Sequence, residues 1–584
     1  MERASSSSSK SSSSMGSSSS DQTSHFVTSS MLSRTSSSSS SAFGDYIGTE
    51  SCFDILEEND VVSAPTKPSN RYRYGGRRRE EREARAAAAR EFPPPIPLLA
   101  QTENLLPHMP WVLKRVVTSD GRLILREEKM EIGLEPKDAV DWSYRGEGAV
   151  NLVLAYTGSS PSFLGKMMRI QKMPNDGKED NGNTSGNGLT SHEKVIWGEC
   201  KELVSCQNKE IVEFLFVKHV MRPLLGHKHV NPGMRLLVAK EFLESVENIV
   251  TSQRPSWRAD AASVDTHRNS VLLMDDLTLF AHGRVEDKPC LSVEIKPKCG
   301  FLPSSSFIAE ENVIKKSITR FEMHQVLKLH DNEISEISEY DPLDLFSGSK
   351  DRIHKAIRAL YATPQNNFRV FLNGSLVFGG LGGGTCKTTS KVEQDFEHLL
   401  KDIIKTKDGS RANHFIELVA ETVYTSGVLD HLLDVQKLDK YNIEGAVHVY
   451  YDLINQPCRV CKELEKSKTS STSQFSSMHS IPMAEKVNVL KEFLISATAK
   501  DCSVMISFRS TDAVISRSSS HSNLHLESAK QEFDYKVHFI DLDMRPLKKM
   551  EVYYELDKKI MNTYLEMVKK KEARGERRAQ RQCF

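Results

Sequence analysis

Two lysines separated by one proline form the segment of this sequence with the clearest chemistry. Residues 294–298 read Glu-Ile-Lys-Pro-Lys, so Lys296 and Lys298 flank Pro297. Proline fixes its own torsion φ and interrupts a helix, so we expect an extended backbone here. Side chains two residues apart on an extended backbone point to the same side, which brings the two ammonium groups together. The segment therefore predicts a binding site for a densely anionic small molecule.

Acidic residues at the ends of two strand-like runs could supply metal and base chemistry. The alternating run 533–540 ends at Asp541, and Asp501 comes directly before the run 502–508. Mg²⁺ prefers a few oxygen ligands together with the phosphates of a substrate. One carboxylate could hold this metal while the other acts as general base for a hydroxyl group. Considered alone, each aspartate is more typical of a turn or a cap.

A glycine-bearing turn is a second place where phosphates could bind. Gly146 and Gly148 stand before Asn151 and the alternating run 152–156. Backbone N–H groups in such a turn can contact nucleotide phosphates, although a plain hairpin turn explains the same pattern. Arg169 favours the phosphate-binding interpretation of the turn, because this residue stands where kinases keep a positive charge for the α- and β-phosphates.

An acidic turn after an apolar strand could contact the adenine of a nucleotide. The apolar run 271–274 leads into Asp275, Asp276 and Leu277. This pattern is typical of a strand that enters a hinge, where backbone groups could hold one edge of the adenine. The alternative is a buried strand that simply ends in an acidic turn.

Two cysteines and two histidines have the spacing of a tetrahedral metal site. Cys458 and Cys461 form a Cys-x2-Cys pair, His448 precedes the pair, and His479 follows it after a serine-rich run. Zinc is held by such Cys2His2 sets, and four protein ligands leave no open position, so this zinc would be structural. Two buried thiols without a metal are the alternative. Loss of the zinc is expected to unfold a local part of the chain.

The run 294–298 resembles the Glu-X-Lys-Pro-Lys signature of the inositol-pentakisphosphate 2-kinases. Residues 320–325 (Arg-Phe-Glu-Met-His-Gln), 340–346 (Tyr-Asp-Pro-Leu-Asp-Leu-Phe) and 366–369 (Asn-Asn-Phe-Arg) match the same family, most closely its plant members, and the likeness runs from about residue 130 to 570. The resemblance implies an ATP- and Mg²⁺-dependent enzyme that phosphorylates the axial 2-hydroxyl of inositol 1,3,4,5,6-pentakisphosphate, giving inositol hexakisphosphate (phytate). The implied fold is α/β (α+β) and two-lobed, with a distantly protein-kinase-like N-lobe and an enlarged inositide-binding C-lobe that carries the structural zinc.

The resemblance also implies roles for individual residues. The general base would be Asp501, and Lys296 would neutralise the transferring phosphate. The nucleotide and its metal would be contacted by Gly148, Ala149, Val150, Asn151, Arg169, Asp275, Asp276, Leu277 and Asp541, with Asp541 as the magnesium ligand. The inositide would be held by Arg258, Lys298, Lys328, Asn366, Arg369, Arg545, Lys549 and Tyr553. The zinc ligands of the plant members correspond to His448, Cys458, Cys461 and His479.

Two positions depart from the family pattern. The glycine turn reads Gly-Glu-Gly-Ala-Val-Asn from Gly146 to Asn151, where plant relatives commonly have another glycine, so its backbone approaches phosphates less freely. In the last helix, Arg545 and Lys549 exchange arginine and lysine relative to the family. The positive charge is kept, but the bidentate geometry of the arginine moves to another position.

Composition limits the class of protein further. The chain has 584 residues, and 78 basic residues balance 78 acidic ones. A net charge of zero argues against a protein built on nonspecific attraction to nucleic acid or membranes. Ten cysteines are scattered without a secreted disulfide framework, and no apolar run could span a membrane. We therefore expect a soluble monomer of the cytoplasm or nucleus that binds ATP and the inositide, without nucleic-acid or membrane partners for the kinase part.

The composition is different before residue 129. Residues 1–44 are mostly serine and too poor in apolar side chains to fold, so we predict a disordered leader; a plastid transit peptide is the alternative. Residues 45–128 include an arginine-rich run and are predicted to be mostly disordered. The runs 44–52, 92–96 and 119–125 resemble the plant FANTASTIC FOUR-like proteins, and this likeness implies no chemistry.

These observations divide the chain into the leader (1–44), the FANTASTIC FOUR-like segment (45–128), the N-lobe (129–290), the C-lobe (291–570) and a basic tail (571–584). Two other functions stay open at this point: another inositol-phosphate kinase, and a non-catalytic regulatory protein dominated by the N-terminal segment. A gene-model error that joined two unrelated halves is a further alternative, which a transcript or peptide across residues 126–135 would exclude.

Overall fold

The computed structural model of the chain describes residues 111–117, 123–129, 134–148, 150–175, 188–206, 208–280, 289–380, 388–407, 409–467, 472–511 and 522–582. The predicted leader and most of the segment 45–128 lie outside these residues. Within that segment, strands β1 (Trp111–Val117) and β2 (Leu123–Lys129) form an antiparallel hairpin. No helix in the described part of the chain is long and apolar enough to cross a membrane.

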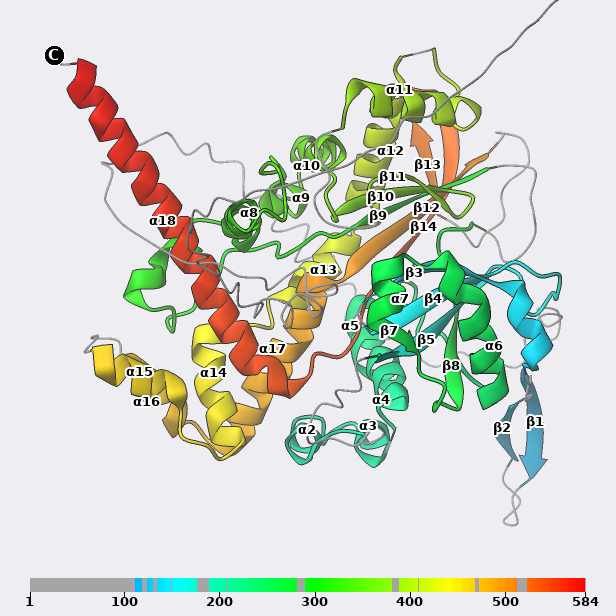
Figure 1. Cartoon of the computed structure of the whole chain (residues 1–584), viewed down its shortest axis with the longest axis horizontal. Coiled ribbons are helices and arrows are strands. Elements are labelled where there is room, and N and C mark those ends of the chain that lie inside the picture. Colours follow the sequence, from blue (N-terminus) through cyan, green and yellow to red (C-terminus); the bar gives the residue numbers. More distant parts are fainter. Residues whose placement is uncertain are drawn as a thin grey trace, which may run out of the picture. The chain divides into compact units, whose positions relative to one another are not determined.

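The smaller of the two main sheets follows this hairpin in the sequence (Figure 1). Its antiparallel strands, in spatial order, are β3 (Trp142–Glu147), β4 (Asn151–Tyr156), β5 (Lys166–Pro174), β8 (Ser270–Asp275) and β6 (Met234–Leu237), and β7 (Ala262–Val264) pairs with β5. In β4, buried Leu152 and Leu154 alternate with less buried residues, as expected for a strand with one face in the core. Helix α6 (Lys240–Val250) packs on this sheet through residues at helical spacing, including buried Phe242 and Val246. The short helix α7 (Ser256–Ala261) leads directly into β7.

The larger sheet is also antiparallel. Its strands, in spatial order, are β11 (Ser375–Phe378), β10 (Phe368–Leu372), β9 (Cys290–Ile295), β12 (Ser503–Thr511), β14 (Gln531–Ile540) and β13 (Ser522–Leu526). Every residue of β9 is buried, so this central strand has no solvent-facing side. A central strand covered on both faces explains why its sequence is nearly continuous in apolar and small residues.

The register of the larger sheet brings three chain segments to one edge. Ile295, the last residue of β9, lies opposite Val504 near the start of β12. Ser503 lies opposite Ile540, the last residue of β14. Because adjacent strands run antiparallel, the end of β9 and the end of β14 meet beside the start of β12. The residues that follow β9, precede β12 and follow β14 are therefore neighbours in space.

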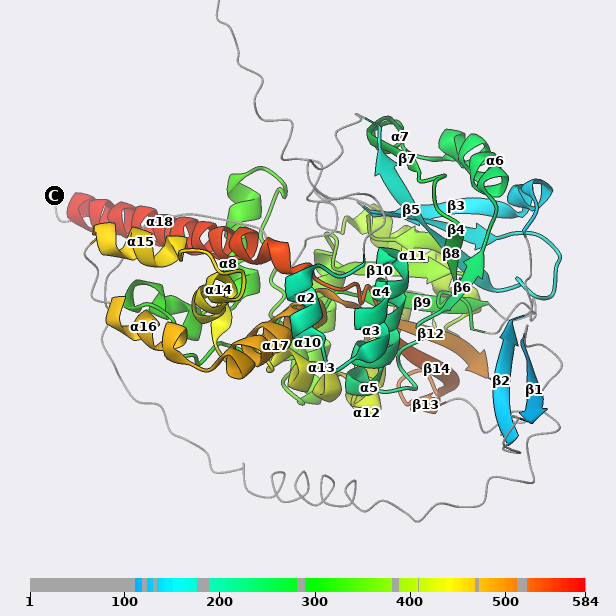
Figure 2. The same cartoon turned by 90° about the horizontal axis from the view of Figure 1, so that it is seen from below.

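The remaining helices precede or follow the start of the larger sheet in the sequence. Those before it are α2 (Ser191–Ile196), α3 (Lys201–Ser205), α4 (Lys209–Phe216) and α5 (Arg222–Leu225); later ones are α8 (Arg320–His330), α9 (Pro342–Leu345), α10 (Lys350–Ala362), α11 (Ser390–Leu399), α12 (Arg411–Ser426), α13 (Val428–Gln436), α14 (Asn442–Leu453), α15 (Arg459–Ser467), α16 (Thr472–Ser480), α17 (Met483–Asp501) and α18 (Met550–Gln582). Helices α11 and α12 lie beside the larger sheet, whereas α15 and α16 lie away from it (Figure 1). Helix α14 contacts α16, α17 and α18, and the second view also shows α14, α15 and α18 side by side (Figure 2).

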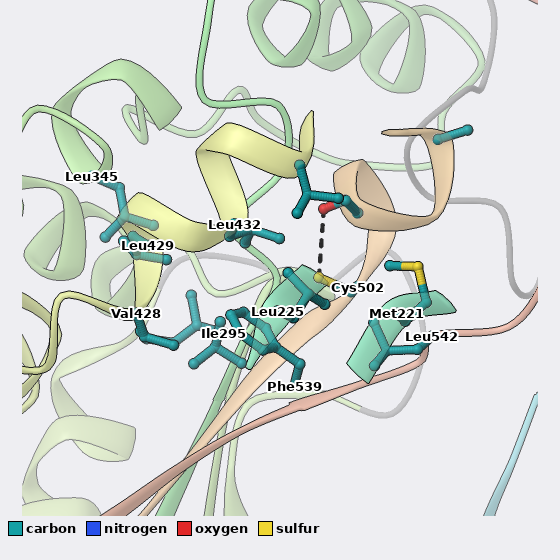
Figure 3. Close-up of a cluster of buried hydrophobic side chains, with 14 of the residues drawn as sticks. Met221, Leu225, Ile295, Leu345, Val428, Leu429, Leu432, Cys502, Phe539 and Leu542 are labelled. Carbon is teal, nitrogen blue, oxygen red and sulfur yellow. Dashed lines mark hydrogen bonds between the residues drawn. The ribbon is translucent and has the colours of Figure 1, made fainter. Parts of the chain in front are cut away.

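One large core joins the helices to the edge of the larger sheet. Figure 3 shows Ile295 and Phe539 from the sheet facing Val428 and Leu432 of α13, with Leu225 of α5 against them. Buried residues between 189 and 230 thus share a core with residues after 290. The chain therefore has a mixed α/β fold with two sheets, while the predicted lobe boundary at residue 290 stays a prediction.

Candidate active site

The shared edge of the larger sheet carries the first pair of predicted catalytic residues. Lys296 follows β9 and Asp541 follows β14, and Lys296 Nζ donates a hydrogen bond to Asp541 Oδ2 at 3.1 Å. Partial desolvation raises the pKa of Asp541, but Lys296 and Arg169 lower it by more, so the carboxyl is more acidic than usual. Desolvation lowers the pKa of Lys296, and the acidic groups led by Asp541 raise it above its usual value. Both groups are therefore held in their charged forms.

The predicted base lies between two cations at the same edge. Asp501 is the last residue of α17 and is only 3% exposed. Arg545 Nη2 donates to Asp501 Oδ2 at 2.5 Å, and Lys298 Nζ lies 3.9 Å from Oδ1. The structure thus brings Lys296, Lys298, Asp501 and Asp541 together. Strand ends predicted this for the two aspartates, whereas the extended backbone expected at the lysines is interrupted at Lys298, whose φ is 61°.

Backbone hydrogen bonds hold the segment 294–298 in place. The N–H of Lys296 donates to the carbonyl of Asn367 at 2.9 Å, and the hydroxyl of Tyr340 donates to the carbonyl of Pro297 at 2.8 Å. The Glu294 carboxylate accepts from Ser503 Oγ at 2.9 Å and from Arg369 Nη1 at 3.1 Å. Glu294 is therefore a buried anchor of the segment and contacts no reacting group itself.

Arg169 on β5 meets acidic groups that the sequence did not single out. It forms an ion pair with Asp543, and with the Asn151 amide turned so that its oxygen faces the guanidinium, Nη2 donates to that oxygen at 2.6 Å. Burial lowers the pKa of Arg169, whereas Asp543, Glu213 and Asp541 raise it above the ordinary arginine value. An open cleft of ≈ 700 Å³ is lined by Arg169, Asn151, Glu213, Asp541 and Asp543.

Asp543 and Glu213 are the residues that sequence reasoning missed as members of this cleft. Asp543 stands two residues after Asp541, so the doubled acid after β14 was a usable signal. Glu213 lies on the short helix α4, far from the other site residues in sequence, and no local pattern marks it. Its membership depends on tertiary packing alone.

The predicted hinge residues face a different cavity. Lys166 Nζ donates to Asp275 Oδ1 at 2.5 Å, and the buried Asp276 accepts from the N–H of Thr278 at 2.9 Å. Asp275, Asp276 and Leu277 line a separate cleft of ≈ 1300 Å³. Both clefts border β8, because Met274 lines the cleft of Arg169 and Asp275 lines the second cleft. A contact between the hinge backbone and adenine stays a prediction.

The glycine turn is a tight hairpin between β3 and β4. The N–H of Gly148 donates to the carbonyl of Asn151 at 2.9 Å, and Val150 is exposed. Ala149, which was predicted to contact the nucleotide, lies outside the described residues. One N–H group of the turn is therefore used in a hydrogen bond within the turn, in agreement with the hairpin alternative. The side chain of Asn151 contacts Arg169 in the cleft.

Several predicted inositide residues gather near Lys298. His324 is buried, and this burial together with the charges of Lys328, Arg320 and Lys298 lowers its pKa well below the usual value. Lys328 Nζ donates to Glu333 at 2.9 Å, and Arg369 Nε donates to the carbonyl of Gly380 at 3.0 Å. Positive side chains from separate elements thus converge on this region, as a polyphosphate requires.

Arg545, Lys549 and Tyr553 lie where the chain passes from β14 to α18. The prediction that Arg545 and Lys549 belong to the last helix was wrong, because Pro546 begins a 3₁₀ turn (Leu547–Lys549) and α18 starts at Met550. Burial lowers the pKa of Lys549 and raises that of Tyr553 to about 12, so Tyr553 keeps its proton. Asn366 is half-buried, two residues before β10.

Arg258 is the one predicted inositide residue on the smaller sheet's side. It lies on α7, with its guanidinium 4.2 Å from the ring centre of Trp257. Its charge influences the pKa values of Tyr144 and Lys172, both on the smaller sheet. Among the described contacts, none joins Arg258 to the cations around Lys298, so this structure leaves Arg258 apart from them.

The four predicted metal ligands come together between α14, α15 and α16. His448, Cys458, Cys461 and His479 have ligand atoms within 4.8 Å of one another. His448 Nδ1 lies 3.4 Å from Cys458 Sγ and 3.3 Å from Cys461 Sγ, and His479 Nε2 lies 3.2 Å from Cys461 Sγ. Burial lowers the pKa of His448 to about 4, which keeps its nitrogens available as ligands. Asp452 Oδ1 accepts from His479 Nδ1 at 2.8 Å and thereby orients that ring.

The mixed α/β fold and the lysine–aspartate pairs at one sheet edge are those of a phosphate-handling enzyme. The model of the inositol-pentakisphosphate 2-kinase family matches residues 144–559. An inositol-pentakisphosphate 2-kinase of Arabidopsis thaliana is 56% identical over 436 residues, which cover 74% of this chain and 95% of the relative. Those of Oryza sativa subsp. indica (48%, covering 74% of this chain and 96% of the relative) and Danio rerio (28%, covering 74% and 94%) are also similar. The chain belongs to the inositol-pentakisphosphate 2-kinase family.

A second family match concerns the N-terminal part. The model described as Fantastic Four meristem regulator matches residues 91–135. This match confirms the resemblance seen in the sequence, over a range that begins later than the predicted segment 45–128 and extends beyond its end.

Proposed function

We propose that the chain transfers the γ-phosphate of ATP to the 2-hydroxyl of inositol 1,3,4,5,6-pentakisphosphate and so forms inositol hexakisphosphate. Membership of the 2-kinase family supports this reaction. The observation that carries the assignment of roles is the pairing of Lys296 with Asp541 and of Lys298 with Asp501 at one sheet edge. Such a site can hold phosphates and remove a hydroxyl proton within one small volume.

In the proposed mechanism, Asp501 is the general base. The inositide phosphates compete with Asp501 for the cations Lys298 and Arg545, and the carboxylate then accepts the proton of the 2-hydroxyl. The 2-oxygen forms its bond to the γ-phosphorus while the bond to the β–γ bridging oxygen breaks, which releases ADP. Lys296 neutralises the negative charge of the phosphate as it is transferred from ATP to the inositide.

We propose that the nucleotide lies between the two sheets in the manner of a distant protein-kinase relative. The smaller sheet would then be the N-lobe, with Asn151 and Arg169 directed to the phosphates. Asp541 would hold Mg²⁺, and the bound metal would neutralise charge on the transferring phosphate. Asp543, which forms an ion pair with Arg169 in the same cleft, would be a second ligand of this metal. Arg258, Lys328, Asn366, Arg369, Lys549 and Tyr553 complete the proposed inositide set.

The Cys2His2 cluster is proposed as a structural zinc site. Four ligand atoms that already lie close together, one from buried His448 and three from half-buried residues, fit a closed tetrahedral site. The test is metal analysis of the purified protein and of the Cys458→Ser variant, with thermal melting before and after chelation. One zinc per chain, lost in the variant together with stability, is expected; a metal-free protein of unchanged stability would exclude the site.

The proposed reaction is tested with the full chain, ATP and Mg²⁺. Phosphorus NMR of the product is expected to show a new phosphate at the 2-position of the pentakisphosphate. Faster turnover of a less phosphorylated inositol would instead favour another inositol-phosphate kinase, and a folded but inactive chain would favour a regulatory protein. Gel filtration and localisation of a tagged chain test the proposals of a monomer in the cytoplasm or nucleus, against a plastid.

A further inference from the structure

One buried glutamine connects the two segments that carry Lys298 and Asp501. Gln436 is the last residue of α13 and has no exposed surface. Its Nε2 donates to the carbonyl of Lys298 at 2.8 Å and to the carbonyl of Ala499 at 3.1 Å, and its Oε1 accepts from the N–H of Gly300 at 2.8 Å. Both amide hydrogens and the amide oxygen are therefore engaged with backbone of other segments.

The backbone at Lys298 needs such support. Its φ is 61°, in the left-handed region that is unfavourable for a residue with a Cβ. Conformations of this kind persist only where surrounding contacts fix them, and they gather at functional sites. Gln436 binds the carbonyl of Lys298 and the N–H of Gly300, so one side chain closes the turn from both ends.

The third hydrogen bond links this turn to the proposed base. Ala499 lies two residues before Asp501 in the last turn of α17, and the hydroxyl of Ser496 on the same helix donates to the carbonyl of Gln436 at 2.5 Å. The Lys298 turn and the end of α17 are thus attached to the same residue. Any shift of one relative to the other changes the 3.9 Å separation of Lys298 Nζ from Asp501 Oδ1.

From this geometry we infer that Gln436 is a positioning residue that fixes the lysine of the inositide site relative to the catalytic base. The inference rests on the proposed function, because it takes the roles of Lys298 and Asp501 from there. Gln436 contacts neither substrate nor reacting atoms. Its action is to keep a strained lysine turn and a helix end in one arrangement, so that binding and deprotonation of the inositide occur in the same geometry.

The chain offers a matched control for an ordinary buried glutamine. Gln531 at the start of β14 also donates twice, to the carbonyl of Ile403 at 2.8 Å and to Ser510 Oγ at 2.7 Å, and accepts the N–H of Lys405 at 3.0 Å. It lies at the end of β14 opposite to Asp541. A purely structural loss should therefore look alike in variants of Gln436 and Gln531.

The first experiment compares Gln436→Leu with Gln531→Leu in the full chain. In Gln436→Leu we expect kcat to fall and the KM for the pentakisphosphate to rise, each by about 10-fold or more, with the KM for ATP within about 2-fold. In Gln531→Leu the melting temperature should fall to a similar extent while both KM values and kcat stay near wild type. Equal kinetic effects in the two variants, or none in a folded Gln436→Leu, would overturn the inference.

The second experiment uses Gln436→Glu, which keeps the size of the side chain and decides the question if Gln436→Leu does not fold. An ionised glutamate accepts the N–H of Gly300 but cannot donate to either carbonyl, whereas a protonated one donates once. The loss of kcat relative to wild type should therefore shrink as the pH falls from 8 to 6. A loss that is absent, or equal at all pH values, would contradict the positioning role. Inactivity of the wild-type chain would instead reject the proposed function itself.

Discussion

Two clusters in this molecule consist of paired acidic and basic side chains, but they differ in how far their acids are exposed to solvent. On the smaller sheet, Glu147, Lys172 and Arg254 have side chains that are 1%, 2% and 0% exposed. Arg254 binds Glu147 through Nε and Nη2 at 2.9 Å each, and Lys172 binds the same carboxylate. Arg254 Nη2 also donates to the carbonyls of Arg258 at 3.0 Å and Ala262 at 2.7 Å. This closed cluster thus fastens the glycine turn to α7.

At the edge of the larger sheet, Asp541 and Asp543 remain open to solvent, whereas Asp501 beside them is buried. The side chains of Asp541 and Asp543 are 56% and 42% exposed, and each is paired with one cation. An exposed carboxylate can bind a metal, or it can release its cation partner to a phosphate. A buried bidentate pair is not broken in this way, because the buried charge would be left without a partner. Ion pairing alone therefore does not identify a reaction site. The closed cluster positions the chain, whereas the exposed acids Asp541 and Asp543 are accessible to a metal or a phosphate.

The largest expected effect tests the reacting cluster. Asp501→Asn keeps the shape of the side chain but removes the base, so kcat should fall by about 10³- to 10⁴-fold. Affinity for ATP should stay within about 2-fold, because Asp501 lies with the inositide cations and not in the cleft of Arg169. Turnover with labelled ATP and calorimetric titration of the nucleotide measure the two effects. A kcat within tenfold of wild type would show that another group removes the proton.

The next effect tests the closed cluster. Glu147→Ala leaves Lys172 and Arg254 as buried cations without their acid, and breaking such a pair costs about 3–5 kcal/mol of unfolding free energy. Guanidinium denaturation measures this loss. Asp543→Ala, which removes an acid that is 42% exposed, should cost less than about 1 kcal/mol. Equal losses in the two variants would remove the distinction between closed and open clusters.

Local sequence patterns predicted the residues that follow or precede strands, because strand periodicity and antiparallel register bring such ends together. Asp501 and Asp541 were found in this way, Lys296 was found from the Lys-Pro-Lys run, and the cysteine–histidine spacing located the cluster of four possible metal ligands. Asp543 was given no role although it follows Asp541 by two residues, and Glu213 was missed because only the folded chain brings it near Arg169. Gln436 and Arg254 carry no motif either, because their roles arise from backbone groups that only the folded chain brings to them.

A smaller effect separates substrate binding from chemistry at the edge of the larger sheet. Lys298→Ala should raise the KM for the pentakisphosphate by about 10- to 100-fold, since a charge-assisted contact to a phosphate is lost. The KM for ATP should change little. Lys440→Ala, which removes an exposed ion pair with Glu492, is the surface control and should leave both values unchanged. An unchanged KM for the inositide in Lys298→Ala would contradict its role in binding.

The smallest effect concerns pH and the closed cluster. Burial raises the pKa of Glu147, but Arg254 and Lys172 lower it by more, so the folded-state pKa lies below the ordinary value of 4.5. A carboxyl with a depressed folded pKa stabilises the protein fully above the unfolded pKa, and this contribution is lost as the pH falls through the folded pKa. The difference in unfolding free energy between wild type and Glu147→Gln should therefore be constant near pH 7 and shrink below about pH 4.5, with a slope of at most ~1.4 kcal/mol per pH unit. Denaturation curves from pH 7 to 3.5 measure it, and a difference that grows on acidification would mean that Glu147 is not held as the anion of this cluster.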